Sequence, residues 1–550
     1  MNSRPAMDAN GRDKYVPPLA LTQAAEAFVQ KYTNEVPSWV LRFAGPFRDL
    51  GVEGTMKEYL NDSVTVNWQR WAERYLINGL GTMVIVSLYF INELPTCDFL
   101  LVLSRPHEIL RFGQFHVSKD AQLSPFVSKH VVNTPDVAMW KQQRRHFMDA
   151  FLPLGPLTAA VPKLISMADV VCTKWLGSVS KGGHAVVDVR SWMHHTALAM
   201  FINCMMGDDR AFGKSSAVST HRVAGYGDSL DFAETTPSNS VTPRSVLNLE
   251  GIGRSMTTAE QEVRFTTILG FTDKLFKRAE ERKEKGHIVG PLMERLMELE
   301  DPEVKFQNAI ATLIAGHDTT AFTMQFCLME LARHPDIQMR VRKEAIAVFS
   351  EIKNKKRSLS YSDLPKFSFM TKCIYETLRL WNVAATVFPR VTSSKEDIEG
   401  SDGKMVRIPN NTKFTFWYYG QHHSKQLWGD DVMAFNPDRS WHPAELQISQ
   451  NTSNPFQGTA MTPSTERFHP FSVPSRDCLG KNFALAEMRI LLPAIVAAFH
   501  VEIPEDSELK HVQPTWRNSV YSSWSRNIGG PTQPHALYLK ITPVNRPSCL

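Results

Sequence analysis

The sequence predicts a mainly α-helical protein with a smaller β-rich region. Three long amphipathic runs, residues 303–333, 368–380 and 481–499, carry the helical part of this prediction. The strand-like segments are short, and 405–408 and 413–419 lie together after the second of these runs. We therefore expect helices to form most of the fold.

The sequence predicts an irregular N-terminal extension followed by one large domain. It has 550 residues, of which 43% are hydrophobic and 21% charged, as in soluble globular proteins. No repeat of fixed period and no low-complexity linker divides its middle. We expect an N-terminal extension over 1–78, without a clear transmembrane span, and one domain over 79–545.

Net charge and the number and spacing of the cysteines argue against several classes of protein. A net charge of +5 is too small for this size to indicate a nucleic-acid partner. The seven cysteines are scattered without a CxxC pair, which favours a reducing compartment and argues against a disulfide framework. It also argues against a cysteine-rich zinc or iron–sulfur site. A metal bound through sulfur would be bound through one sulfur.

No run approaches the roughly 20 apolar residues that cross a bilayer. The longest, 83–91, is short enough to be a buried strand, and with 99–103 it predicts a hairpin followed by a helix from Arg105. The first 30 residues carry charges and lack the apolar centre of a secretory signal. We expect an intracellular protein, soluble or peripheral on the cytoplasmic face of an internal membrane.

A helix predicted over 135–151 carries Trp140 and Arg144, which share a face because they are four residues apart. Two interpretations stay open: a surface arginine lying over an aromatic ring, or an indole and a guanidinium that reach one anionic group. Residues 213–256 are rich in Ser, Thr, Gly and Pro. They predict a mobile segment such as a substrate-entry loop.

The run 303–333 is the strongest helix, and Pro335 follows its end. Its middle, 315–320, reads AGHDTT, and glycine and threonine are poor choices for a helix interior. One interpretation is that the threonines bond to carbonyls one turn earlier and bend the helix. The other is that small residues make room for a planar ligand, while Asp318 and Thr319 handle protons beside it.

Glu376 and Arg379 lie three residues apart on the helix 368–380. Such a pair is usually solvated, but the apolar residues around it favour burial here. A buried pair needs further partners, and Arg439 is a candidate. A long polar loop is expected over 440–468.

The loop before the last long helix contains Phe471, Arg476, Cys478 and Gly480. A sulfur at a helix N-terminus meets unpaired N–H groups and the positive end of the helix dipole. Both effects lower a thiol's pKa and favour the thiolate that binds metal.

In order, the chain shows Trp-x3-Arg, Ala-Gly-x-Asp-Thr-Thr, Glu-x-x-Arg, Phe-x-Pro-x-Arg and Phe-x6-Cys-x-Gly. This series, which is specific in its order and spacing, strongly resembles the cytochrome P450 family over roughly residues 80–545. The resemblance implies a triangular, helix-rich domain. It also implies haem b held between the long distal helix and the proximal cysteine loop.

The resemblance implies a role for each matching residue. Cys478 would be the axial thiolate on the haem iron, and Asp318 and Thr319 would deliver protons to bound dioxygen. The charge triad of the proximal core would consist of Glu376, Arg379 and Arg439. Phe471 would pack beside the sulfur, and His422 would have a packing or hydrogen-bonding role. The candidates for holding the haem propionates are Trp140, Arg144, Arg390 and Arg476.

Two departures from the family pattern stand out. Pro474 stands where the family usually has glycine. The proline fixes φ near roughly −65° and removes a backbone donor. The tight turn would then be rebuilt through Ser475. The N-terminal membrane span of most microsomal members is also missing.

The leading function implied is monooxygenation of a small apolar organic substrate by dioxygen. Its electrons would come from a separate NADPH-dependent reductase or another donor, because the chain has no flavin or nicotinamide fingerprint. A reductase-independent isomerase or peroxygenase is the alternative, disfavoured by Asp318 and Thr319. A non-catalytic haem-binding protein is a third, made conceivable by Pro474.

Overall fold

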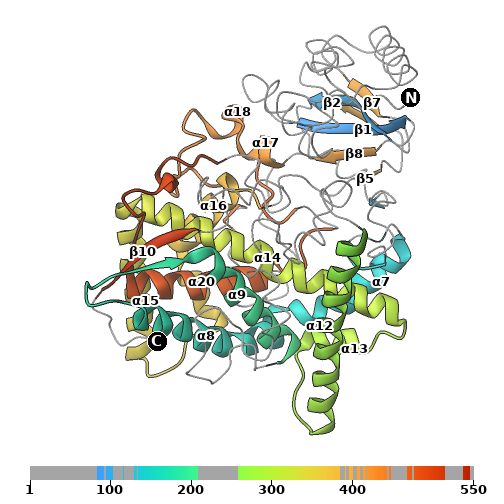
Figure 1. Cartoon of the computed structure of the whole chain (residues 1–550). Helices are drawn as coiled ribbons and strands as arrows, with labels where there is room; N and C mark the ends of the chain where they lie inside the picture. The colour runs from blue at the N-terminus through green and yellow to red at the C-terminus, as the bar shows by residue number, and fades with distance from the viewer. Residues whose placement is uncertain are drawn as a thin grey trace, which may run out of the picture. The chain divides into compact units, whose positions relative to one another are not determined.

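The chain was analysed as a computed structural model (Figure 1). The structure describes residues 83–91, 94–102, 115–116, 129–132, 134, 136–208, 258–383, 390–391, 396–399, 405–408, 413–416, 418–442, 445–446, 467–472, 476–514 and 537–544. The predictions for 1–78, 213–256, the helix from Arg105 and Pro474 fall outside these residues, as does most of 440–468.

Two compact units make up the chain. One combines residues 1–117 with 385–432, and the other combines 118–384 with 433–550. The division predicted at residue 78 stays a prediction.

The described part of the first unit is mostly antiparallel sheet. Five strands form one sheet in the order β2-β1-β8-β5-β3, and β6 pairs with β7. The bounds are β1 Met83–Ile91, β2 Leu94–Val102, β3 Phe115–His116, β5 Arg390–Val391, β6 Glu396–Glu399, β7 Met405–Ile408 and β8 Lys413–Phe416. The predicted hairpin is confirmed, because β1 and β2 pair antiparallel with Ile91 opposite Leu94.

The strand expected over 413–419 is wrong at its end. β8 stops at Phe416, and the short helices α17 Tyr418–His422 and α18 Lys425–Trp428 follow. Tyr419 and His423 stack with ring centroids 3.9 Å apart, and the His423 ring bonds to the Tyr419 carbonyl at 2.8 Å. These contacts between residues four apart favour a helical turn there.

The second unit is built mainly from helices. They are α7 Val137–Met148, α8 Thr158–Gly177, α9 Val189–Phe201, α12 Thr258–Glu284, α13 Pro291–Met297, α14 Pro302–Arg333, α15 Pro335–Asn354, α16 Ser368–Leu380 and α20 Lys481–Ala498. Three strands, β4 Ala185–Asp188, β9 Phe499–Glu502 and β10 Tyr538–Pro543, form a sheet in the order β4-β10-β9.

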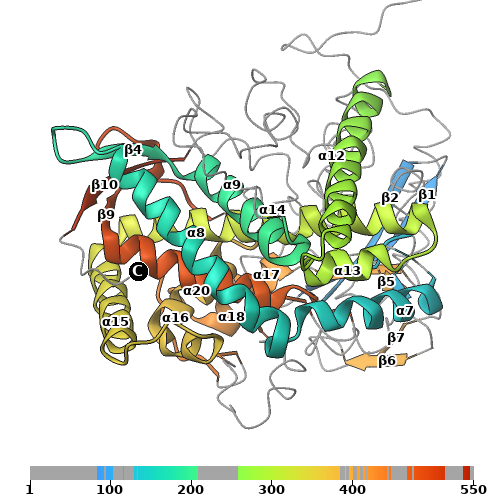
Figure 2. The same ribbon diagram turned by 90° about the horizontal axis from the view of Figure 1, so that it is seen from below.

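The long helix α14 crosses this unit and organises its core. Asp301 caps its N-terminus by accepting from the backbone N–H of Glu303 at 2.8 Å, and Pro302 fits the first turn, where no N–H is needed. Thirty-two residues at about 1.5 Å each give a length of roughly 48 Å. Figure 2 shows α8, α20, α14 and α9 running side by side, and their packing forms the centre of the unit.

Helix α8 is the described helix that could be mistaken for a membrane span. By length and composition alone, residues 155–177 are apolar enough to cross a bilayer, and no other helix among the described residues is. Leu164, Val171 and Trp175 of α8 are buried in the unit, whereas Leu176 is 47% exposed. The expectation that no run of the sequence is long and apolar enough to cross a bilayer is therefore wrong for residues 155–177.

A glycine allows α9 to approach α14 closely. A Cβ atom on Gly316 would lie 2.2 Å from the ring of Phe201, which is buried at the end of α9. Gly316 thus makes room for a neighbouring helix, whereas the sequence interpretation gave that room to a planar ligand.

We predict that Gly316→Ala destabilises the protein by about 1–3 kcal/mol, because the added methyl overlaps a ring with no room to move. The helix-propensity gain of about 1 kcal/mol is too small to offset this. Gly270→Ala on α12 is the matched control, since no atom lies within 4 Å of its Cβ position. It should be neutral or stabilising in denaturant titrations. Equal stability of the two variants would contradict the close approach.

Helix α20 buries one carboxyl group in the core. Glu487 is fully buried, and neither of its carboxyl oxygens has a hydrogen-bond partner among the described residues. Burial raises its pKa well above the ordinary value of 4.5, because the charged form loses its hydration. The folded protein therefore keeps a proton that the unfolded chain loses above pH 4.5.

This proton makes stability depend on pH in a known direction. The folded state binds more protons, so the free energy of unfolding falls as pH rises from 4.5 toward the raised pKa of Glu487. We predict that Glu487→Gln removes that decline and that Glu487→Met is more stable than wild type at pH 7. Urea titrations from pH 4.5 to 8 measure both, with the exposed Glu281→Gln as control. A slope unchanged in Glu487→Gln would refute the assignment.

Candidate functional site

Cys478 lies in the loop that leads into α20. Its backbone N–H donates to the carbonyl of Phe471 at 2.9 Å, which closes the loop, and Ser472 takes a positive φ of 63° at the turn. The described cysteines 172, 204, 327 and 373 are buried, whereas the Cys478 side chain is exposed. Cys478 is thus the accessible thiol among the described cysteines.

A buried carboxylate holds this loop from two sides. Asp477 accepts from Arg144 on α7 through both its carbonyl, at 2.9 Å, and its side chain. The other carboxylate oxygen lies 2.5 Å from the ammonium of Lys481, in the first turn of α20. Asp477 is only 7% exposed, so the two cations compensate a carboxylate that has lost most of its water.

The pKa of the Cys478 thiol moves in the direction opposite to our expectation. The sulfur is accessible at its surface but surrounded by protein, and this loss of hydration raises its pKa. The backbone N–H of Gly480 and the charges of Lys481 and Arg144 act to lower it, as the position at the helix start predicts, but they are outweighed. A bound metal ion deprotonates a coordinating thiol outright.

Three of the four predicted anion-holding residues lie together. Trp140 is buried, with the Arg476 guanidinium 4.3 Å and that of Arg144 6.0 Å from its ring centroid. Arg476 also donates to the Thr134 carbonyl at 3.3 Å. Arg390 begins β5 in the other unit, and its side chain lies outside the described residues. Trp140, Arg144 and Arg476 therefore form one cluster beside the cysteine loop.

The centre of α14 has an accessible stripe. Ala315 is exposed near the middle of α14, whereas residues 320–332 are buried, and Ala311 and Thr319, one turn to either side of Ala315, are half-buried. The Thr319 hydroxyl donates to the Ala315 carbonyl at 3.0 Å. The expected threonine back-bond is therefore present, and it lies on this strip of small side chains.

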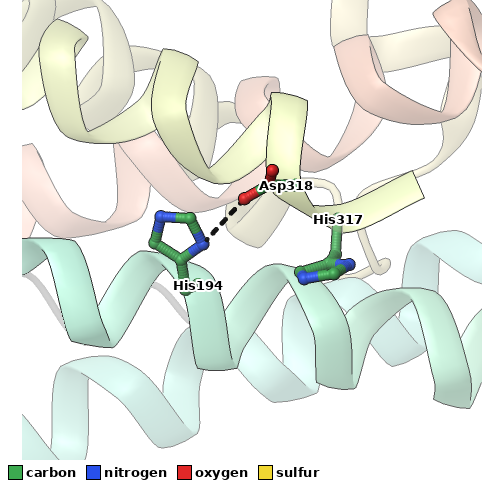
Figure 3. A group of neighbouring side chains, drawn as sticks. All are labelled: His194, His317 and Asp318. Atoms are coloured by element: carbon green, nitrogen blue, oxygen red, sulfur yellow. Dashed lines mark ion pairs between the residues drawn. The ribbon is translucent and has the colours of Figure 1, made fainter. Parts of the chain in front are cut away.

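Asp318 faces a different side of α14. It is 5% exposed, and its Oδ1 lies 3.3 Å from Nδ1 of His194 on α9. Figure 3 shows His194, His317 and Asp318 together between the two helices. Nδ1 of His317 bonds to the Leu313 carbonyl at 2.6 Å. Since neighbouring residues on a helix point about 100° apart, Asp318 is buried while Thr319 is accessible.

The structure brings the predicted charge triad together. Glu376 accepts from Nε of Arg379 at 2.9 Å and from Nε of Arg439 at 2.8 Å, and all three side chains are buried. The backbone N–H of Asn436 also donates to Glu376, at 3.0 Å. Both guanidinium groups donate to the Ala434 carbonyl. These bonds fix the segment around 434–439 against α16.

Two residues of the site, Asp477 and His194, were not predicted from the sequence. Asp477 had a local signal, since an acid four residues before Lys481 can pair with it across one helical turn. His194 had none, because it is 124 positions away from Asp318 and meets it only when α9 packs on α14.

Within the described residues, the fold and site define a helical protein with one accessible thiol at the start of a core helix. Residues 106–523 match the family model described as cytochrome P450. This stretch is more than half of the chain and contains every site residue named above. The chain belongs to the cytochrome P450 family, and its cofactor is haem, with the iron held by a cysteine thiolate.

Several curated proteins are similar over part of the chain. Cytochrome P450 4F5 of Rattus norvegicus is 30% identical over 211 residues, which are 38% of this chain and 35% of that protein. Cytokinin hydroxylase of Arabidopsis thaliana is 32% identical over 192 residues, 35% of this chain and 32% of that protein. Leukotriene-B4 omega-hydroxylase 3 of Mus musculus is 31% identical over 211 residues, which are 38% of this chain and 36% of that protein. The chain thus spans about a third of the length of these relatives.

The residues present fit a haem. One accessible thiol stands in a loop fixed by Asp477, and α14 in the same unit carries an accessible stripe of small side chains in its middle. Arg144 and Arg476 supply cations beside the loop for carboxylate groups.

We predict that Glu376→Gln destabilises the second unit by about 3–5 kcal/mol, because it leaves two buried guanidinium groups without a carboxylate. The measurements are denaturant titration and haem content after purification. Asp438→Asn is the control, since it removes an ion pair to Arg340 in which both side chains are about half exposed, worth about 0–1 kcal/mol. If Glu376→Gln lowers the free energy of unfolding no more than Asp438→Asn does, the triad does not stabilise the fold.

Proposed function

We propose that this protein is a haem-thiolate monooxygenase. It would insert one atom of dioxygen into a small apolar organic substrate: RH + O₂ + 2e⁻ + 2H⁺ → ROH + H₂O. The single observation that carries the proposal is the accessible Cys478 thiol at the start of α20, within the region that matches the P450 family. The two electrons would come from a separate NADPH-dependent reductase or another donor.

Cys478 would hold the haem iron. The bound haem supplies the oxygen-activating chemistry, and a thiolate ligand favours O–O cleavage by donating electron density. The chain's own part is to fix the sulfur: the Phe471 carbonyl holds the Cys478 N–H, and Asp477 ties the loop to α7 and α20. Phe471, half-buried at the start of the loop, would pack beside the sulfur.

Thr319 and Asp318 would manage protons from two sides of α14. The Thr319 hydroxyl gives its own hydrogen to the Ala315 carbonyl, so its lone pairs can accept a hydrogen bond from water on the accessible stripe. Asp318 would supply its carboxylate behind this stripe, where it pairs with His194. Side-chain rotation at Asp318 or a water molecule would connect the two.

The haem propionates would lie against the cluster of Trp140, Arg144 and Arg476. Planar guanidinium groups suit carboxylates, and stacking on Trp140 orients the one on Arg476. That Arg390 also holds a propionate stays a prediction. Glu376, Arg379 and Arg439 would serve as the structural lock of the proximal core.

The names of the relatives favour hydroxylation of an organic molecule, since they include a cytokinin hydroxylase and a leukotriene-B4 omega-hydroxylase. Peripheral contact with an internal membrane and an intracellular location stay predictions. A reductase-independent isomerase or peroxygenase is the second candidate function, and the Asp318–Thr319 pair disfavours it.

The reduced, CO-bound absorption spectrum tests the ligand. We expect a strongly red-shifted Soret band that is lost completely in Cys478→Ala and kept in Cys172→Ala, which removes a buried core thiol from α8. A histidine-type spectrum in the wild-type protein would overturn the assignment of Cys478.

Turnover separates the candidate functions. Oxygen uptake with NADPH and a P450 reductase, measured with a set of apolar test substrates, should exceed that of Cys478→Ala. Product formed from hydrogen peroxide but never from reductase and NADPH would favour the peroxygenase. Stoichiometric haem without turnover in either system would favour a non-catalytic haem protein.

A further inference from the structure

Two histidines and an aspartate converge between α9 and α14 (Figure 3). The three residues are His194, His317 and Asp318, and their potential ligand atoms all lie within 4.8 Å of one another. We propose that they form a second metal site, separate from the haem, that takes a divalent first-row transition ion such as Zn²⁺.

One pair of side chains already has the spacing of two ligands on one ion. With metal–ligand bonds of about 2.0–2.1 Å, the corners of a tetrahedron around Zn²⁺ lie about 3.3 Å apart. Nδ1 of His194 and Oδ1 of Asp318 are separated by 3.3 Å. They could bind one ion without a change in the backbone.

His317 supplies the third ligand in a suitable tautomer. Because its Nδ1 lies 2.6 Å from the Leu313 carbonyl, Nδ1 carries the hydrogen and Nε2 carries the lone pair. Metal-binding histidines typically donate their second ring nitrogen to such a carbonyl. His317 is half-buried, and the largest ligand separation of 4.8 Å must close by about 1.5 Å, which a side-chain rotation can achieve.

The chemistry of the ligand set selects the ion. Two neutral imidazoles and one carboxylate suit Zn²⁺ and its neighbours, whereas Mg²⁺ and Ca²⁺ prefer oxygen ligands. A simple ion pair would need only His194 and Asp318, so the convergence of a second imidazole distinguishes a metal site from a salt bridge. Arg190, one turn before His194, has its guanidinium 5.7 Å from the ring centroid of Phe322 and adds a positive charge to this region that weakens cation binding.

The site can be tested on the resting, haem-loaded protein without any turnover, so the result does not depend on the proposed function. Untagged protein is dialysed to equilibrium against Zn²⁺, and zinc and iron are counted per chain. We expect one zinc per chain in the wild type and at least tenfold weaker binding in His194→Ala, His317→Ala and Asp318→Asn. Mg²⁺ should not compete.

His195→Ala is the matched control. His195 neighbours His194 on α9, but its Nδ1 bonds to the Ser191 carbonyl of its own helix at 2.8 Å. This variant should bind zinc as the wild type does. The CO-bound spectrum of each variant verifies that its haem pocket is intact, so that a lost site is distinguished from a lost fold.

Zinc X-ray absorption gives the second measurement. Two imidazole ligands at about 2.0 Å are expected in the wild type, and fewer in either histidine variant. Zinc binding that is absent in the wild type, or equal in all of the variants, would overturn the proposal.

Discussion

The carboxylate of Asp477 is the contact on which the functional site depends. It is nearly buried, and two cations from different helices, Arg144 on α7 and Lys481 on α20, meet it directly beside Cys478. Removing either cation would leave a buried charge with half its compensation, a state that costs more than the pair itself contributes. The loop that carries the thiol is therefore fixed by these ion pairs together with the hydrogen bond from the Cys478 N–H to the Phe471 carbonyl.

Buried carboxylates shared by donors from two segments also occur elsewhere in the second unit. Glu376 is shared by Arg379 and Arg439, and Glu330 on α14 accepts from Arg333 at 3.1 Å and from the indole of Trp381 at 2.9 Å. Each carboxylate joins segments that are far apart in sequence. A shared carboxylate can hold irregular backbone next to a helix, where regular hydrogen bonding is not available.

The sequence predicted what depends on local pattern. The bounds of α16 agree with the expected 368–380, and α14 differs by one residue at its start. What it missed depends on packing between distant segments. Phe201 fills the space beside Gly316 that one of the two interpretations of the motif gave to a planar ligand, and the raised pKa of Cys478 arises from the protein around the sulfur. Spacing along the chain contains no information on either.

The motif of α14 shows why adjacent residues can serve different purposes. Asp318 and Thr319 are read together in sequence, yet the helix points them about 100° apart, one toward α9 and one toward the accessible stripe. The Thr319–Ala315 bond lies within α14 and does not involve the carboxylate. An ion held by His194 and Asp318 would therefore engage the acid while leaving the hydroxyl in place. Asp318 and Thr319 lie on different faces of α14. Proton supply by the acid and placement of the hydroxyl can therefore be changed separately.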